Sequence, residues 1–183
     1  MTILAWHFLA VTGLLRDGTA PPANGEWLRH DGALIMCEQG LHASVRAIDA
    51  LRYTPGAVVC RVECGGLMET QSDKLVCAER RILWRADATE ALRGFARWCA
   101  LSVADKWDMP TVVREYLETG DESKRGAARA AAGAVWAAAD AAWGAAGAVW
   151  AAADAASAAR AAADAAWGAQ NTELERRLTE LAP

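Results

Sequence analysis

The sequence predicts an α+β protein with a small strand-rich head and packing helices over residues 1–120, followed by an alanine-rich helical tail over residues 121–183. The first region mixes all residue types, and its short apolar runs are bounded by glycine and proline, as strands usually are. The second region is dominated by alanine from Gly126 to Gln170, and alanine has the highest helix propensity. A chain of 183 residues suits one small domain with an appendage.

Four segments of the head have the pattern of strands. Residues 3–11 are apolar enough for a first strand, and residues 26–37 predict a hairpin with Asp31-Gly32 as its turn. Residues 57–63 alternate in their second half and are followed by two glycines, which we expect to end the strand. Residues 75–84 contain a further strand.

Helix start and stop signals divide the rest of the head. Ser44 is placed to cap a short helix that continues to about residue 52. Asp87, with a glutamate three residues later, has the spacing of a capping box and predicts a helix to about residue 106. Residues 110–120 begin with a proline and end with a glycine, which predicts one more helix.

The tail contains an internal repeat with a period of 14 residues, which is about four helical turns. Residues 133–146 read GAVWAAADAAWGAA and residues 147–160 read GAVWAAADAASAAR, and a degenerate third copy follows. The glycines at positions 144 and 147 predict a kink or a helical hairpin. Thr172 and Glu175 have capping-box spacing and predict a fresh helix there.

Tryptophans make the tail a candidate interaction surface. Trp136, Trp143 and Trp150 are seven residues apart and form one stripe on the predicted helix. The tail could fold back and bury this stripe on the head, or it could associate with another chain. Because a hairpin would leave much of the tail exposed, we expect a homo-oligomer, most simply a dimer, or binding to a host protein. Charged residues interrupt the run too often for a membrane span.

Composition narrows the classes of protein further. The net charge of −4 and the lack of a basic patch make a nucleic-acid partner unexpected. Five cysteines follow no secretory signal, so we expect reduced thiols and a cytoplasmic location. Cys60 and Cys64 form one close pair, but zinc sites usually need a second pair, and we therefore expect no metal.

The densest group of chemically useful residues lies in residues 37–44, between a predicted strand and a predicted helix. His42 could act as an acid or a base, and Ser44 at the helix start could help to bind an anion. A turn at Gly40, a local hydrogen bond of His42 and helix capping by Ser44 would also explain these residues, and we favour this structural interpretation. Glu79, in a predicted strand, could stabilise a positive charge or form an ion pair with a neighbouring arginine.

The ring side chains of one tyrosine and one histidine in the head could serve either ligand binding or core packing. Tyr53 and His7 could line a ligand pocket or belong to the core. The common signatures of nucleotide-binding loops, zinc proteases and α/β-hydrolases are absent from the sequence. If the protein is an enzyme, we therefore expect it to belong to a class that has no strong sequence motif.

Residues 30–85 resemble an uncharacterised family common in phage and prophage genomes. The resemblance lies in the run CEQGLHAS at residues 37–44, the VE-x-x-G strand at residues 62–66, and Asp73-Lys74. An alanine-rich tail with a Gln-Asn pair, as at residues 170–171, is similar to the tails of that family. The resemblance implies a phage or mobile-element origin and carries no activity.

A fainter resemblance is to ADP-ribosyltransferase-like folds. His7, then Ser44 or Tyr53, then Glu79 occur in the order in which that fold places its functional groups. The chain lacks an S-T-S motif, and Cys77 stands where the partner of the late glutamate is usual. The transferase that this resemblance suggests would use NAD, with His42, Tyr53 and Glu79 as its catalytic set and His7 and Ser44 as ligand-binding residues.

Two functional hypotheses follow. In the first, the chain is a phage-type accessory protein, for example a counter-defence factor, that acts by binding through its tail and needs no cofactor. In the alternative, the head is a nucleotide-using transferase.

Overall fold

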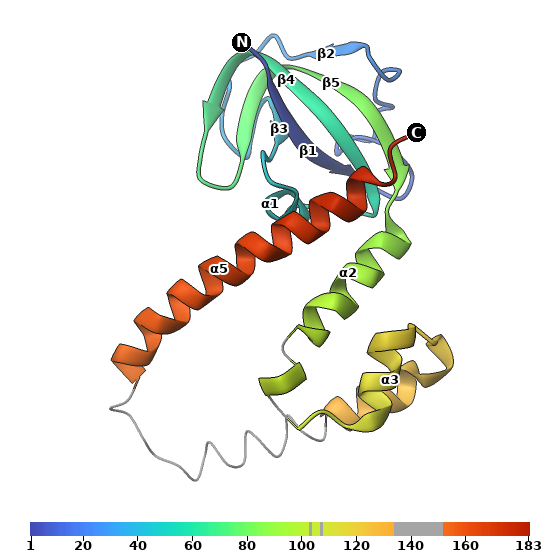
Figure 1. The fold of residues 1–183 in the computed structure, drawn as a ribbon. Coiled ribbons are helices and arrows are strands. Elements are labelled where there is room, and N and C mark those ends of the chain that lie inside the picture. The colour runs from blue at the N-terminus through green and yellow to red at the C-terminus, as the bar shows by residue number, and fades with distance from the viewer. Residues whose placement is uncertain (103, 107, 134–151) are drawn as a thin grey trace. The chain divides into compact units, whose positions relative to one another are not determined.

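The computed structural model describes residues 1–102, 104–106, 108–133 and 152–183 (Figure 1). Contacts divide the chain into two compact units. The first unit contains residues 1–92 together with residues 170–183, and the second contains residues 93–169. The first unit is therefore built from two segments that are far apart in the sequence.

The first unit contains a five-stranded antiparallel sheet (Figure 1). Its strands are β1 (Ile3–Leu9), β2 (Trp27–Arg29), β3 (Leu41–Ala43), β4 (Val58–Thr70) and β5 (Leu75–Asp87). The order is β1-β4-β5-β2, and β3 also pairs with β5. The long β4–β5 hairpin therefore forms the centre of the sheet.

Backbone hydrogen bonds also join the residue after β3 to β1. The Trp6 N–H donates to the Ser44 carbonyl at 2.7 Å, and the Ser44 N–H donates to the Trp6 carbonyl at 3.0 Å. Register shifts in β4, after Arg61 and after Gly65, allow the long hairpin to bend. The sheet therefore curls until β3 meets β1, and one of its faces becomes an enclosed interior.

Small and apolar side chains fill this interior. They are Ala5, Leu9, Ala43, Cys60, Val62, Cys64, Leu75, Cys77 and Ile82. Alternate residues of β1 and of the first half of β4 contribute to this set, because successive side chains in a strand point to opposite faces. Three of the five cysteines therefore belong to the core, as small buried residues.

The helix α1 (Ala47–Leu51) is capped by the end of α5 (Ala152–Thr179), which lies beside it (Figure 1). The Ala47 N–H donates to Glu175 Oε1 at 3.2 Å, and the Ile48 N–H donates to Asn171 Oδ1 at 3.1 Å. Leu174 and Leu178 on the same helix are 0% exposed. Residues 170–183 therefore complete the first unit.

The second unit is helical in its described part. Its elements include α2 (Thr89–Leu101), which begins in the first unit, the short 3-10 helix η1 (Ala104–Lys106), α3 (Thr111–Thr119) and η2 (Glu122–Lys124). Residues 125–133 are also helical. Within this unit, Phe95 stacks on Trp98 with ring centroids 6.2 Å apart, and Lys124 pairs with Glu115 at 2.6 Å.

The structure confirms the α+β class and several elements. The predicted strand at residues 3–11 is β1, and the strands predicted at residues 57–63 and 75–84 are β4 and β5. β4 continues through Gly65-Gly66, so the expectation that these glycines end the strand was wrong. Gly66 has φ 70° at the register shift, where it bends the strand instead of ending it.

The hairpin predicted at residues 26–37 does not form. β2 pairs with β5, and a separate short turn brings Ile35 opposite Gln39. The Asp31-Gly32 signal is local, whereas the partner of β2 is set by burial against a strand that is distant in sequence.

The capping signals in the sequence predicted some helix boundaries correctly and others wrongly. Ser44 does not cap α1, because the helix begins at Ala47 and its N-cap is Arg46, while the Ser44 backbone pairs with Trp6. Asp87 does accept a hydrogen bond from the Thr89 N–H at 2.8 Å, but α2 ends at Leu101. The helix predicted at residues 110–120 is α3, and Gly120 ends it in the left-handed conformation.

The tail is partly described. Residues 152–179 form the single helix α5, so the fresh helix predicted at Thr172 is wrong. The tryptophans Trp136, Trp143 and Trp150 and the predicted kink at positions 144 and 147 lie outside the described residues. A long continuous tail, and a domain boundary near residue 120, stay predictions.

None of the described helices combines the length and the apolar character that a membrane span requires.

Candidate functional site

His7 and His42 are brought together at the curled sheet. Arg80 lies beside them with 4% of its surface exposed, and its Nη1 donates a hydrogen bond to the His42 carbonyl. Burial holds the pKa of His7 well below its usual range, and the positive charges of Arg80 and His42 lower it further. Near pH 7, His7 is therefore neutral.

His42 has a structural task of its own. Its Nε2 accepts a hydrogen bond from the Cys37 N–H at 2.9 Å, so the ring proton of the neutral form belongs on Nδ1. Burial lowers the pKa of His42, and a hydrogen bond with the Gly40 backbone opposes that shift. Because Cys37 has φ 69°, this bond holds a strained turn.

Tyr53 belongs to a surface cluster that contains Cys37, Asp73 and Lys74. The Tyr53 hydroxyl donates to Asp73 Oδ2 at 2.5 Å, and Lys74 Nζ lies 3.5 Å from the Tyr53 oxygen and 5.1 Å from its ring centroid. A hydrogen bond with the Cys37 side chain is the largest cause of a raised pKa at Lys74. His42 and Tyr53 therefore approach the same turn: the His42 ring accepts from the Cys37 backbone, and Tyr53 contacts Lys74, which is hydrogen bonded to the Cys37 side chain.

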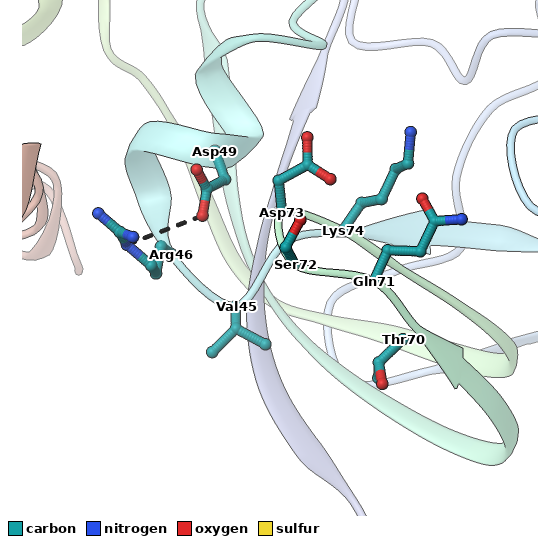
Figure 2. Close-up of a pocket in the computed structure, with 8 residues that line it drawn as sticks. All are labelled: Val45, Arg46, Asp49, Thr70, Gln71, Ser72, Asp73 and Lys74. Atoms are coloured by element: carbon teal, nitrogen blue, oxygen red, sulfur yellow. Dashed lines mark ion pairs between the residues drawn. The ribbon is translucent and has the colours of Figure 1, made fainter. Parts of the chain in front are cut away.

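A pocket of about 250 Å³ lies beside this cluster (Figure 2). Val45, Arg46 and Asp49 line one side, and residues 70–74 of the β4–β5 turn line the other. Asp49 is 5% exposed and pairs with Arg46, with Nε 3.7 Å from Oδ2. Two carboxylates, a lysine and an arginine are among the residues of its wall.

Glu79 takes a different partner from the other two members of the predicted catalytic set. It lies opposite Arg29 in the β2–β5 ladder, and Arg29 Nε is 3.3 Å from Glu79 Oε1. Ion pairing, one of the two roles considered for Glu79, is what the structure shows. Neither His42 nor Tyr53 is among its hydrogen-bond or ion-pair partners in the described residues.

Ser44 is 2% exposed, and its backbone closes the sheet against Trp6. It therefore lies next to His7 across the β3–β1 junction, although neither residue lines the pocket. In the described part of the chain, no group of three potential ligands is arranged to hold a metal ion.

Two features of the first unit were not predicted from the sequence. Arg80 looked like an ordinary strand arginine, but it is buried among cysteines. Asn171 and Glu175 looked like tail residues, but they cap α1. A signal for the second feature existed, since residues 171–178 read NTELERRL and place Leu174 and Leu178 one helical turn apart.

Residues 22–94 match a family model for a domain of unknown function, DUF7666. The match covers β2 to β5 and the first turn of α2, but neither β1 nor residues 170–183. No curated protein and no solved structure matches the chain significantly.

Proposed function

We propose that the protein acts by binding, as a cytoplasmic accessory protein that associates with copies of itself or with a host protein through its helical C-terminal segment. The observation that carries the proposal is the seat that the first unit offers to residues 170–183. Two leucines of this segment are fully buried, and two of its polar side chains cap another helix.

The seat recognises a helix through two kinds of contact. The N–H groups of Ala47 and Ile48 are the donors that a helix start leaves without partners inside the helix, and Glu175 and Asn171 satisfy them. Arg61, stacked on Trp6 with its guanidinium carbon 4.5 Å from the ring centroid, carries a charge that interacts with Glu175. Burial of the two leucines would provide the affinity for the bound helix, and the two capping hydrogen bonds would fix its position along the seat.

The same contacts would form if the helix came from a second copy of the chain. In the sequence, residues 93–169 separate the strands from residues 170–183, so a long stretch of chain joins the docked segment to the sheet. Exchange of one identical element between two copies is a low-cost route to a dimer. A phage or mobile-element setting rests on the sequence resemblance alone.

Co-expression of two differently tagged full-length chains tests self-association. We expect each tag to capture the other, and light scattering to give a mass near twice 19.5 kDa. Replacing Trp136, Trp143 and Trp150 with alanine tests the tail stripe, and Leu174→Asp tests helix exchange. A wild-type protein that is a monomer at tens of micromolar and captures no host protein would contradict the proposal.

The alternative is an NAD-using transferase, and one observation favours it: His42 and Tyr53 approach the same turn, and a pocket lies beside it. Glu79 would then need another role, because it is paired with Arg29. Incubation of the full chain with labelled NAD and cell lysate separates the two functions. Label transfer that is lost in Tyr53→Phe and Glu79→Gln would establish the transferase and overturn pure binding.

A further inference from the structure

The C-terminal segment contacts the rest of the first unit through one face of its helix. The residues that make these contacts are spaced i, i+3, i+4 and i+7, which places them on one side of α5. They are Asn171, Leu174, Glu175 and Leu178. By the same helical spacing, Glu180 lies on the opposite side of the segment, and 64% of its side chain is exposed.

The polar contacts of this face fill a need that α1 does not meet itself. The N-cap residue of α1 is Arg46, whose side chain makes no capping hydrogen bond. Asn171 Oδ1 accepts from the Ile48 N–H, and Glu175 Oε1 accepts from the Ala47 N–H. A helix of five residues is too short to be stable alone, so α1 depends on these distant acceptors.

A third contact favours an acid at the position of Glu175. The Arg61 guanidinium carbon lies 4.5 Å from the centroid of the Trp6 ring, and its Nη1 is buried with no hydrogen-bond partner among the described residues. A buried donor of this kind is costly unless a partner or an opposite charge compensates it. Glu175 is the acidic residue whose charge acts on Arg61.

The segment is attached to the first unit in the way that a tethered ligand is attached to its site. Residues 170–183 belong to the first unit, whereas the 93–169 stretch that precedes them in the sequence belongs to the second. Covalent attachment raises the local concentration of the segment, so any other helix must compete with it for the same contacts.

We propose that the seat is a recognition site for an amphipathic helix of a partner protein with the pattern Asn-x-x-Leu-Glu-x-x-Leu, and that the chain's own C-terminal segment blocks the site until it is displaced. This inference rests on the proposed function and adds the chemistry of the partner. Two leucines one helical turn apart are buried, and an amide and an acid one turn apart accept from backbone N–H groups.

The test compares the wild-type full-length chain with a full-length Leu174→Asp chain, whose own segment is weakened. The probe is a fluorescein-labelled peptide of residues 166–183, and its anisotropy measures binding. We expect the peptide to bind the Leu174→Asp chain and to bind the wild type at least about tenfold more weakly, because the wild-type segment competes. If the Leu174→Asp chain does not fold alone, saturating peptide should restore a cooperative thermal transition, since a ligand of the folded state stabilises it.

Peptide variants identify the contacts that matter. Leu174→Asp in the peptide should abolish binding, and Asn171→Ala should weaken it about fivefold, as the loss of a helix cap does. Glu180→Gln, on the opposite side, is the matched control and should change the affinity less than about twofold. A designed peptide that keeps only the four contact residues on an alanine- and lysine-rich helix should bind within about tenfold of the native peptide.

The outcomes separate this inference from the proposed function. A native peptide that neither binds the folded Leu174→Asp chain nor restores its folding would overturn the inference, even if wild-type chains associate through another surface. Binding of the native but not the designed peptide would show that the pattern is wrong. If a second wild-type chain binds but neither peptide does, the occupant is a copy of the chain and the inference fails. Peptide binding without self-association or capture of a host protein would leave the site established and contradict the proposed function.

Discussion

The two compact units differ in their longest polar contacts, although both also contain pairs three or four residues apart. In the first unit, Glu175 caps Ala47 across 128 residues, and Arg81 pairs with Glu63 across 18. In the described part of the second unit, Arg125 pairs with Glu122 three residues away, and Arg114 pairs with Glu118 four residues away. Contacts between distant segments therefore help to hold the first unit together, whereas the described polar pairs of the second unit lie within or between neighbouring helices.

The largest expected effect concerns the buried leucines of α5. Leu174→Ala or Leu178→Ala should lower the free energy of unfolding of the first unit by about 2–5 kcal/mol, because each removes a fully buried side chain. Urea unfolding followed by tryptophan fluorescence measures the loss. Leu181→Ala, at a partly exposed position on the same segment, should cost much less. Equal losses in the two variants would mean that the C-terminal segment is not seated as described.

Replacement of glycine by alanine should change stability in opposite directions in the two units. Gly40 has φ 109°, and an added Cβ would lie 2.4 Å from Val76 Cγ2, so Gly40→Ala should cost at least about 1–3 kcal/mol. Gly126 lies in the helical residues 125–133 with nothing within 4 Å of an added Cβ. Gly126→Ala should stabilise that helix by about 0.5–1 kcal/mol. Thermal melting of both variants checks the signs, and a stable Gly40→Ala protein would contradict the positive φ.

Acid should destabilise the first unit through His7. Its pKa in the folded state lies below the unfolded value of about 6.5, so the unfolded chain binds more protons as the pH falls below that value. Stability should therefore be greatest above about pH 6.5 and decrease by up to about 1.4 kcal/mol per pH unit for this group. Urea midpoints at several pH values measure the slope.

His42, whose pKa burial also lowers, adds to the acid effect in the same direction. A His7→Gln variant should show a shallower slope than the wild type, because the group whose pKa burial lowers is removed. A wild-type slope of zero between pH 7 and pH 5 would show that His7 is accessible and protonates freely.

The smallest effect concerns the caps between distant segments. Asn171→Ala removes the acceptor for the Ile48 N–H and should cost about 1 kcal/mol, as loss of a helix cap usually does. Asn171→Asp keeps the acceptor oxygen and should restore most of the stability. Amide hydrogen exchange at Ile48 provides a local readout, which should accelerate in Asn171→Ala alone. Unchanged protection would place the acceptor elsewhere.

The elements that were predictable from the sequence are those with local signals. β1, β4 and β5 show apolar runs, and α3 has a proline at its start and a glycine at its end. The pairing of β2 with β5 was not predictable, because a three-residue strand carries too little pattern to identify its partner. For the same reason the capping of α1 by α5 could not be read from either segment alone.

The candidate site was predictable only in part. His7 and His42 were singled out and do lie together, but their neighbour Arg80 was considered only as an ion-pair partner of Glu79. Glu79 pairs with Arg29 instead, because the ladder places these residues directly opposite each other. The ion-pair partner of a strand residue is set by the register of the two strands. That register in turn depends on which face of the whole sheet is buried, which no single segment reveals.

The two-segment construction of the first unit has a consequence for biosynthesis. A ribosome makes β1 to β5 first, then residues 93–169, and only afterwards the segment with Leu174 and Leu178. At about 5–20 residues per second, the nascent sheet waits for seconds with the N–H groups of Ala47 and Ile48 uncapped. A chain whose translation stops in the alanine-rich region would therefore keep an open seat, a feature that chaperones and proteases could use to tell truncated products from finished ones.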